Sequence, residues 1–366
     1  MKILIDHQTF SMQRYGGISR YFANLNAGFN ATPGVSSRIA TLYSQNEYID
    51  KDSLPLAGIG KSLFGDNKDK AFKWNRRYSR WMLRLSDHDV FHPTYYDPYF
   101  IKYCRKPFVV TLHDMIYELY PELFDHTAQE IIRRKKLLMD KAAAVIAISE
   151  HTKQDILHFY PELEPKIKVV HHGHIPTIAD SGDKLQLPER YILYVGERWH
   201  YKNFTPFVNA IAPLLQQDPS LHLICAGGGK FSEEESALFA KLNIDKQLTQ
   251  MNVTDEQLTQ LYSQALLFAF PSKQEGFGLP VLEAFANQCP VVCSNTTALP
   301  EVAGEAAAYF DPASADSMRT AISNVLQDGT LRGQLIQQGT QRLSQFSMED
   351  CVNNTIEVYR SVTGKE

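Results

Sequence analysis

The chain has 366 residues, of which 44% are hydrophobic and 21% charged, and its formal net charge is −4. This composition is typical of a globular protein, and the length predicts two domains that each bury a core. A net negative charge without a recognition motif argues against nucleic-acid binding. The odd number of cysteines, mostly in apolar runs, predicts free thiols in a reducing compartment rather than a disulfide framework.

Membrane-spanning and secreted proteins are not expected either. Asp6 interrupts the apolar run at the N-terminus, which argues against a signal peptide. No stretch approaches the roughly 20 apolar residues that a membrane span needs. We therefore expect a cytoplasmic protein, in which peripheral contact with the inner face of the cytoplasmic membrane stays open.

Short apolar runs alternate with longer helical patterns through the first half of the chain. Runs that are apolar at every position predict strands buried on both faces, and their alternation with helices predicts a parallel sheet. The predicted strands are residues 3–5, 90–92, 108–112, 144–148 and 168–170.

Two of these strands lead into candidate ligand-binding residues. The loop after strand 3–5 contains Gly16 and Gly17, and a Gly-Gly pair before a helix lets a phosphate or sugar approach closely, although it also suits a plain turn. His113 follows strand 108–112, at the carboxyl end where open parallel sheets bind ligands. We therefore favour a site role for His113 over a structural one.

Residues 68–84, KDKAFKWNRRYSRWMLR, contain seven Lys/Arg and one Asp, and Trp74 and Trp81 share one helical face. A basic amphipathic helix with Trp can lie on an anionic membrane. The alternative is an ordinary helix that packs its Trp face on the core. Residues 133–141 are also basic. The sequence leaves both interpretations open.

Two short clusters resemble metal-binding motifs in residue type but not in spacing or position, so we expect no metal site. The sequence His171-His172-Gly173-His174 has no Cys or acidic partner at ligand spacing. The sequence Asp87-His88-Asp89 precedes a strand rather than following it, and we interpret it as a surface turn.

The strand pattern restarts after a polar stretch without periodicity, which we interpret as an interdomain linker at 175–188. It separates a domain at 1–174 from a second at 189–345. The second set of predicted strands is 191–195, 221–226, 266–269 and 290–293.

Three loops of the second domain carry candidate site residues. Strand 191–195 leads into a loop with Arg198 and Lys202. Strand 221–226 ends in three glycines, Gly227 to Gly229, where the backbone can pass close to a ligand. In the segment around Val253, Thr254 or Asp255 is expected to cap the following helix.

The segment PSKQEGFGLPVLEAFA, residues 271–286, predicts a strand end, a polar loop and a helix that begins near Leu279. Gly276 and Gly278 allow close backbone approach, and the helix points its positive end at the same place, which favours an anion. Glu275 lies in the loop and Glu283 one turn into the helix. One carboxylate is thus placed for sugar hydroxyls and the other for a ribose diol.

The stretch EGFGLPVLEA, with its continuation PVVCSNTTALPEVAGEAAAYFDP, resembles the Glu-x7-Glu motif of retaining glycosyltransferases of family 4, also called glycosyl transferases group 1. The resemblance implies an α/β protein with the GT-B fold, in which two Rossmann-like doubly wound parallel sheets face across a cleft. It also implies a C-terminal helix, 346–366, that crosses back to the first domain. YGGISRYF, FHPTYYDPYF and VTLHDMIYELYPE narrow the resemblance to bacterial mannosyltransferases of surface-polysaccharide synthesis.

The family resemblance implies roles for these residues. Arg198 and Lys202 would neutralise the donor diphosphate, while Glu275 contacts the transferred sugar and Glu283 the ribose. His113 would contact the donor sugar, and Gly16 and Gly17 would lie beside the diphosphate and the acceptor. The other implied donor contacts are Gly228, Val253, Gly276, Phe277, Gly278 and Leu279.

The expected substrates are a nucleotide-sugar donor, with GDP-mannose preferred over a UDP- or dTDP-sugar, and a glycan or lipid-linked oligosaccharide acceptor. No cofactor or metal is expected, because fixed cations and helix termini can meet the charge of a leaving diphosphate. A non-catalytic sugar-nucleotide-binding protein is a rival, which loss of Arg198, Lys202 or Glu275 would have favoured. An oxidoreductase would need Gly-x-Gly-x-x-Gly after the first strand, where the loop offers only Gly16-Gly17.

Overall fold

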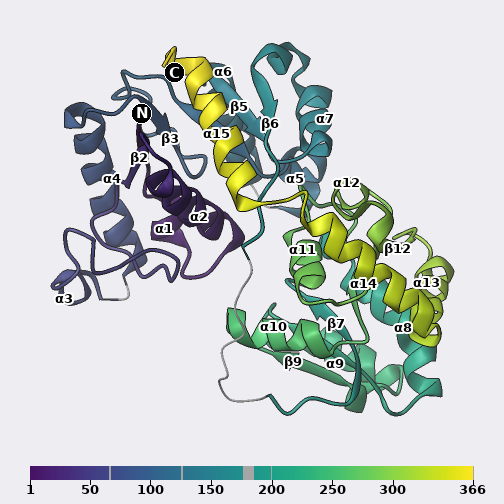
Figure 1. Cartoon of the computed structure of the whole chain (residues 1–366). Helices are drawn as coiled ribbons and strands as arrows, with labels where there is room; N and C mark the ends of the chain where they lie inside the picture. Colours follow the sequence, from purple (N-terminus) through teal and green to yellow (C-terminus); the bar gives the residue numbers. More distant parts are fainter. Residues whose placement is uncertain (66, 125–126, 176–184, 199, 366) are drawn as a thin grey trace. The chain divides into compact units, whose positions relative to one another are not determined.

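A computed structural model of the chain describes residues 1–65, 67–124, 127–175, 185–198 and 200–365 (Figure 1). It divides into two compact units. Unit 1 comprises Met1–Gly173 and Met348–Glu366, and unit 2 comprises His174–Ser347. Most of the predicted linker, residues 176–184, lies outside the described residues.

Unit 1 is built on parallel strands that occur in two three-stranded sheets, β2-β1-β3 and β4-β5-β6. An isolated parallel bridge between Phe91 and Phe108 joins β3 to β4. The carboxyl ends of the strands within each sheet therefore lie on one edge. The strands are β1 (Lys2–Ile5), β2 (Ser36–Ile39), β3 (Val90–His92), β4 (Val109–Leu112), β5 (Ala144–Ala147) and β6 (Ile167–Val169).

The last helix of the chain packs on unit 1, against α2. A side chain at Gly28 of α2 would place its Cβ 2.3 Å from Val352 Cγ2, so this contact requires glycine. The Tyr359 hydroxyl, buried in the same interface, is hydrogen-bonded to His92 Nδ1 at 2.5 Å. The helices of unit 1 are α1 (Gln8–Met12), α2 (Gly17–Ala31), α3 (Gly60–Phe64), α4 (Lys68–Leu85), α5 (Ile116–Leu119), α6 (Thr127–Lys141), α7 (Glu150–Phe159) and α15 (Met348–Thr363), with 3-10 turns η1 (Pro121–Leu123) and η2 (Pro161–Lys166).

Unit 2 contains one six-stranded parallel sheet in the order β12-β11-β10-β7-β8-β9. The chain winds outward from β7 to β9 and then returns to the other side of β7 with β10. The strand order thus reverses between β7 and β10, which is where doubly wound sheets bind ligands beyond the carboxyl ends of their strands. The strands are β7 (Arg190–Val195), β8 (Leu221–Ala226), β9 (Leu248–Met251), β10 (Leu267–Phe270), β11 (Val291–Ser294) and β12 (Ala307–Phe310).

Helices cover this sheet, and the core lies between them and the strands. Tyr194 of β7, for example, packs against Phe204 and Phe207 of α8. The helices of unit 2 are α8 (Phe204–Gln217), α9 (Glu233–Lys241), α10 (Asp255–Gln264), α11 (Leu279–Ala286), α12 (Leu299–Ala303), α13 (Ala315–Gln327) and α14 (Gly329–Leu343), with 3-10 turns η3 (His200–Lys202), η4 (Asp245–Gln247) and η5 (Gly304–Ala306).

Each apolar run that predicted a strand overlaps one, and the ends agree within one residue. The sequence interpretation missed three strands, β2, β9 and β12, and each of these lies at the edge of its sheet. Within the part of the chain that the structure describes, no helix combines the length and apolar character needed to cross a membrane.

Candidate functional site

Lys202 and Glu275 meet where the strand order of unit 2 reverses. Lys202 ends η3 in the loop after β7, and Glu275 lies in the loop between β10 and α11. Their side chains form an ion pair with Nζ 2.6 Å from Oε1, and only 19% and 13% of the two side chains is exposed. Partial burial weakens solvent screening, so the Coulomb attraction between these two charges is stronger than in a surface ion pair. The structure thus brings two residues predicted to bind the donor into direct contact.

Backbone hydrogen bonds fix the loops that carry this pair. The Lys273 N–H donates to the Tyr201 carbonyl at 2.7 Å, joining the loops after β10 and β7. The Glu275 N–H donates to Thr297 Oγ1 at 3.3 Å, from the loop after β11. Three neighbouring strand ends therefore position Glu275.

The start of α11 faces the same loop. Gly278 caps the helix with φ at +121°, where L side chains are strained, and a Cβ there would lie 3.0 Å from Leu299 Cδ2. Pro280 in the first turn costs no hydrogen bond. The Phe277 side chain is buried against Phe346, with ring centroids 5.7 Å apart, so it anchors the loop to the core. Any donor contact at Phe277 is thus left to its backbone.

Glu283 lies inside α11, beside α10. The Tyr262 hydroxyl, from a side chain buried in the core, donates to Glu283 Oε2 at 3.4 Å. Gly276 is buried, and Leu279 is half-buried at the start of the helix. The two glutamates thus occupy different surroundings, with Glu275 paired to a cation and Glu283 bonded to a neutral phenol.

The hydrogen bonds of the Arg198 side chain go to other residues of unit 2. Its guanidinium donates to the Glu235 carboxylate, with Nε 2.9 Å from Oε1, and to the carbonyls of Gly227, Gly229 and Lys230 at 2.9 to 3.0 Å. Its side chain is 5% exposed and lies over the Phe231 ring. A direct contact between Arg198 and a diphosphate stays a prediction. The structure shows that Arg198 holds the glycine loop after β8.

The three glycines of that loop adopt backbone conformations that other residues rarely adopt. Gly227, Gly228 and Gly229 all have φ between +69° and +87°, in the left-handed region. A Cβ on Gly228 would lie 2.6 Å from Arg198 Nη1 and 2.9 Å from the Gly196 carbonyl oxygen. The absent side chain at Gly228 therefore makes room for the Arg198 guanidinium. The Gly227 N–H also donates to the Met251 carbonyl at 3.0 Å. This bond places the segment around Val253 beside the loop.

The residue that caps α10 is Thr254, one of the two that the sequence offered. Its hydroxyl accepts from the Gln257 N–H at 3.3 Å, and the Gln257 side chain accepts from the Thr254 N–H at 3.1 Å. This capping box fixes the backbone just after Val253.

In unit 1, His113 lies directly after β4 among other aromatic rings. It is stacked on His172 with centroids 5.7 Å apart, and Tyr21 of α2 packs edge-on against it at 5.5 Å. Tyr21 is one turn beyond Gly17, so the Gly16-Gly17 helix start and His113 share one region of unit 1. Gly16 caps α2 with extended backbone. No hydrogen-bond partner of His113 Nε2 occurs among the described residues.

Burial lowers the pKa of His113 to about 3, and the nearby His92 and Lys135 act in the same direction. His113 is therefore neutral at physiological pH. Its Nε2 atom can accept a hydrogen bond from a hydroxyl or donate one, depending on the tautomer.

Buried neutral histidines predict how stability depends on pH. The folded pKa of His113 is about 3, below the unfolded value of 6.5, so its contribution is complete above pH 6.5 and is lost as the pH falls towards 3. Between pH 6 and pH 5, the unfolding free energy of His113→Gln should therefore fall by about 1.4 kcal/mol less per pH unit than that of the wild type. Urea unfolding of both proteins at these pH values, followed by tryptophan fluorescence, measures this. An unchanged pH slope would show that folded His113 accepts a proton.

Sequence interpretation missed Asp6, which directly follows β1 and is fully buried. Its carboxylate accepts bonds from the N–H and hydroxyl of Thr94 and from the N–H and side-chain amide of Gln8. Burial raises the pKa of Asp6 although these bonds oppose the shift. Asp6 ties the loops after β1 and β3 together, and an acid directly after a buried strand was the available signal.

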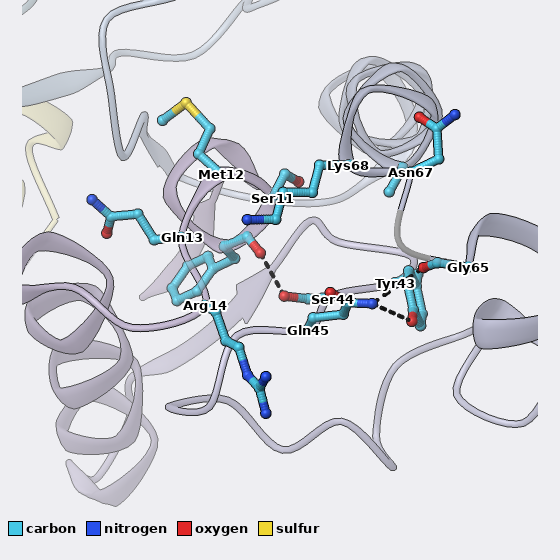
Figure 2. A pocket seen from close by; sticks show the side chains of 12 residues that line it. Ser11, Met12, Gln13, Arg14, Tyr43, Ser44, Gln45, Gly65, Asn67 and Lys68 are labelled. Carbon is cyan, nitrogen blue, oxygen red and sulfur yellow. Dashed lines mark hydrogen bonds between the residues drawn. The ribbon is translucent and has the colours of Figure 1, made fainter. Parts of the chain in front are cut away.

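A pocket in unit 1 was also not anticipated (Figure 2). It lies where α1, the segment after β2 and the start of α4 meet. Gln45 spans it, donating to the Tyr43 hydroxyl at 3.4 Å and to the Gly65 carbonyl at 3.1 Å. Its enclosed volume of about 20 Å³ holds little more than one water molecule. A neighbouring open pocket of about 370 Å³ shares Arg14, Tyr43, Ser44 and Gln45.

The two metal-like clusters take part in other contacts. Asp87 pairs with Lys2 and Asp89 with Lys365, both at 2.6 Å, at the amino end of β3. His172 packs against Tyr21 with ring centroids 4.4 Å apart. Over the described residues, no group of three or more His, Cys, Asp or Glu side chains is placed to hold a metal ion.

Both halves of the chain match known family models. The model described as "Glycosyl transferases group 1" matches residues 180–342, and the one described as "Glycosyltransferase Family 4" matches residues 15–176. O-antigen chain mannosyltransferase B of Escherichia coli is 29% identical over 300 residues, covering 78% of this chain and 77% of the relative. O-antigen chain mannosyltransferase RfbU of Salmonella typhimurium is 28% identical over 223 residues, covering 60% of each.

Solved structures resemble the chain over its full length. Sucrose-phosphate synthase from Thermosynechococcus elongatus has a TM-score of 0.75 at 21% identity, covering 100% of this chain and 99% of that one. The HepE protein of Anabaena, solved with UDP and glucose, has a TM-score of 0.73 at 18% identity and covers 99% of each chain. At these identities the likeness shows the fold alone.

Proposed function

This chain belongs to the family 4, group 1 glycosyltransferases, and on that premise we propose that it transfers mannose from GDP-mannose to a glycan or lipid-linked acceptor in bacterial surface-polysaccharide synthesis. It has the GT-B fold, as the sequence predicted. The similarity to two O-antigen mannosyltransferases supports the choice of mannose. The second candidate donor is a UDP-sugar; UDP is the nucleotide present in the HepE structure, which shares the fold.

The observation that carries the proposal is the Lys202–Glu275 pair at the strand-order reversal of unit 2. A diphosphate here would meet the Lys202 ammonium and the start of α11, which both favour negative charge. Glu275, whose backbone N–H is held by the Thr297 hydroxyl of the β11 loop, would accept hydrogen bonds from the sugar hydroxyls with its carboxylate. Glu283 would accept bonds from the ribose.

We infer that transfer needs no divalent metal and retains the anomeric configuration. Metal independence is supported by the Lys202 charge and the α11 terminus, which can stabilise a leaving diphosphate. Asp87 and Asp89 lie at the amino end of β3 and pair with lysines, so they are unsuited to this role. In the retaining scheme that the family implies, the leaving phosphate accepts the acceptor's proton. His113 would then contact the donor sugar as a neutral group.

The acceptor would bind unit 1, where the open pocket beside Arg14, Tyr43 and Gln45 offers polar groups to a sugar.

The cytoplasm is the proposed compartment. All five cysteines are free thiols, and four of them are buried, as expected for a protein of a reducing environment.

Two measurements test this function. Thermal shifts with GDP, UDP, dTDP and ADP identify the base, because a ligand at 100 times its Kd adds about 2.7 kcal/mol of stability. Transfer from the matching sugar nucleotide, with the product anomer assigned by NMR, tests the reaction. We expect GDP to stabilise most and transfer to persist in EDTA. Stabilisation by UDP alone would select the second donor. Loss of transfer in EDTA that magnesium or manganese restores would overturn metal independence.

The two glutamates provide a matched pair of variants. Glu283→Gln should weaken binding of the free nucleoside diphosphate by roughly 10- to 100-fold, since a charged hydrogen bond is worth about 1.5–3 kcal/mol. Glu275→Gln should strongly reduce kcat but leave this affinity unchanged or tighter, because it frees Lys202. Calorimetry with the nucleoside diphosphate, beside steady-state kinetics, separates the roles. A reversed pattern would exchange the two assignments, and equal weakening would contradict both.

A further inference from the structure

The outward face of α4 combines exposed aromatic side chains with exposed cations. Trp74, Trp81 and Leu85 are 46%, 54% and 65% exposed. Lys70, Lys73, Arg77 and Arg84 of the same helix are exposed as well. We call these seven residues the outer face of α4. The helix lies on the outside of unit 1 (Figure 1).

The opposite side of α4 packs on unit 1, which settles the alternative that the sequence left open. The buried residues of α4 are Ala71, Asn75, Ser79, Met82 and Leu83. Asn75 anchors this side by accepting from the Leu42 N–H at 2.9 Å and donating to the Ser11 hydroxyl at 2.8 Å. The tryptophans are therefore not part of the core.

Helical geometry sorts the outer face into two stripes. At about 3.6 residues per turn, all seven residues fall within an arc of roughly 120°. Trp74, Trp81 and Leu85 align along one side of that arc. The four cations align along the other side. Local contacts hold the aromatic rings, because Tyr78 stacks on Trp81 at 5.8 Å and the Arg77 guanidinium lies 5.6 Å from the Trp74 ring centroid.

This pattern identifies the partner by its chemistry. A helix with Trp and Leu beside Lys and Arg can insert its apolar side into the headgroup region while its cations meet anionic lipid headgroups. Charge opposes pairing of the face with a second copy, because α4 carries seven Lys/Arg and a single acid, Asp69. We propose that the outer face of α4 docks the protein onto an anionic bilayer surface.

Vesicle binding by the full chain tests this proposal without any reference to transfer activity. The wild type should co-sediment with phosphatidylcholine vesicles that contain phosphatidylglycerol, but not with pure phosphatidylcholine vesicles. Arg77→Gln/Arg84→Gln should bind roughly 30-fold more weakly, because each surface cation contributes about 1 kcal/mol. Lys241→Gln/Lys246→Gln, which removes two exposed charges from unit 2, is the matched control and should bind normally.

Tryptophan emission reports whether the aromatic stripe inserts. Emission of the wild type should shift to shorter wavelength on binding, because Trp74 and Trp81 leave water. Trp74→Ser/Trp81→Ser should lose both the shift and most of the binding, while circular dichroism confirms that it is folded. Absence of binding to the anionic vesicles, or equal loss in the control, would overturn the proposal. So would a dimer in sedimentation that Arg77→Gln/Arg84→Gln dissociates, which would assign the face to a second copy.

Discussion

Lys202→Met should lower kcat roughly 100- to 1000-fold, the range for removing one preorganised group that stabilises charge in a transition state. Lys202 reaches Glu275 Oε1 at 2.6 Å in a partly buried site, so its ammonium lies beside the position proposed for the leaving diphosphate. Lys202→Arg should retain part of the activity, because it keeps the charge but not the compact geometry. Steady-state kinetics with the donor identified by the thermal-shift screen measures both effects.

Lys273→Met is the matched control for this prediction. Lys273 is exposed, lies two residues before Glu275, and enters the same loop network through its backbone rather than its ammonium. Its replacement should leave kcat unchanged. Calorimetry adds a second readout, because Lys202→Met should weaken binding of the nucleoside diphosphate but not of the nucleoside. Near-normal turnover and diphosphate affinity in a folded Lys202→Met protein would remove Lys202 from the donor site.

Arg198→Ala should destabilise unit 2 by roughly 3–5 kcal/mol, because breaking a buried ion pair leaves its partner charge uncompensated. The Glu235 carboxylate and three loop carbonyls each lose a charged donor when the guanidinium is removed. Chemical unfolding measures the loss. Arg190→Ala is the control, because its pair with Asp218 is about 40% exposed on each side and is worth at most about 1 kcal/mol.

A second pair of variants separates a positioning role of Arg198 from direct contact with the diphosphate. If Arg198 acts through the glycine loop, Glu235→Gln and Arg198→Lys should both weaken nucleoside-diphosphate binding, because each loosens the same loop. If Arg198 contacts the diphosphate itself, Arg198→Lys should reduce kcat while Glu235→Gln leaves both affinity and kcat intact. We expect the first pattern, because the guanidinium already donates to Glu235 and to three carbonyls.

The sequence predicted the central strands of all three sheets but not three of the edge strands. A central strand such as β5 is buried on both faces, so all of its residues are apolar. The edge strand β2 alternates between exposed and half-buried residues and includes Ser36 and Arg38. β9 and β12 are also half-buried. A partly solvated strand lacks the apolar run by which the central strands were found, so only pairing with a neighbour identifies it.

The candidate site also combines features that the local sequence predicts with features that only the tertiary structure decides. Local pattern alone placed Lys202 and Glu275 after strands, and it marked Gly278 and Pro280 as the start of a helix. Their pairing across 73 residues depends on β10 lying beside β7, which is set by the packing of the whole sheet. Tertiary packing also decided which cation is buried. The charges of Arg198 and Lys202 look alike in the sequence, but only Arg198 lies under the glycine loop, where Glu235 and the loop carbonyls use its donors.

The sequence by itself determined the fold class and the loops that carry the candidate site, because these depend on short-range hydrophobic periodicity and on glycines and charges at strand ends. The family followed from the resemblance of EGFGLPVLEA to the Glu-x7-Glu motif. Tertiary structure alone decided which charges pair, that Asp6 is buried among hydrogen-bond donors, and that the Trp74 and Trp81 side of α4 faces outward. The physical reason is that burial and pairing depend on which distant segments meet, and no local pattern records that.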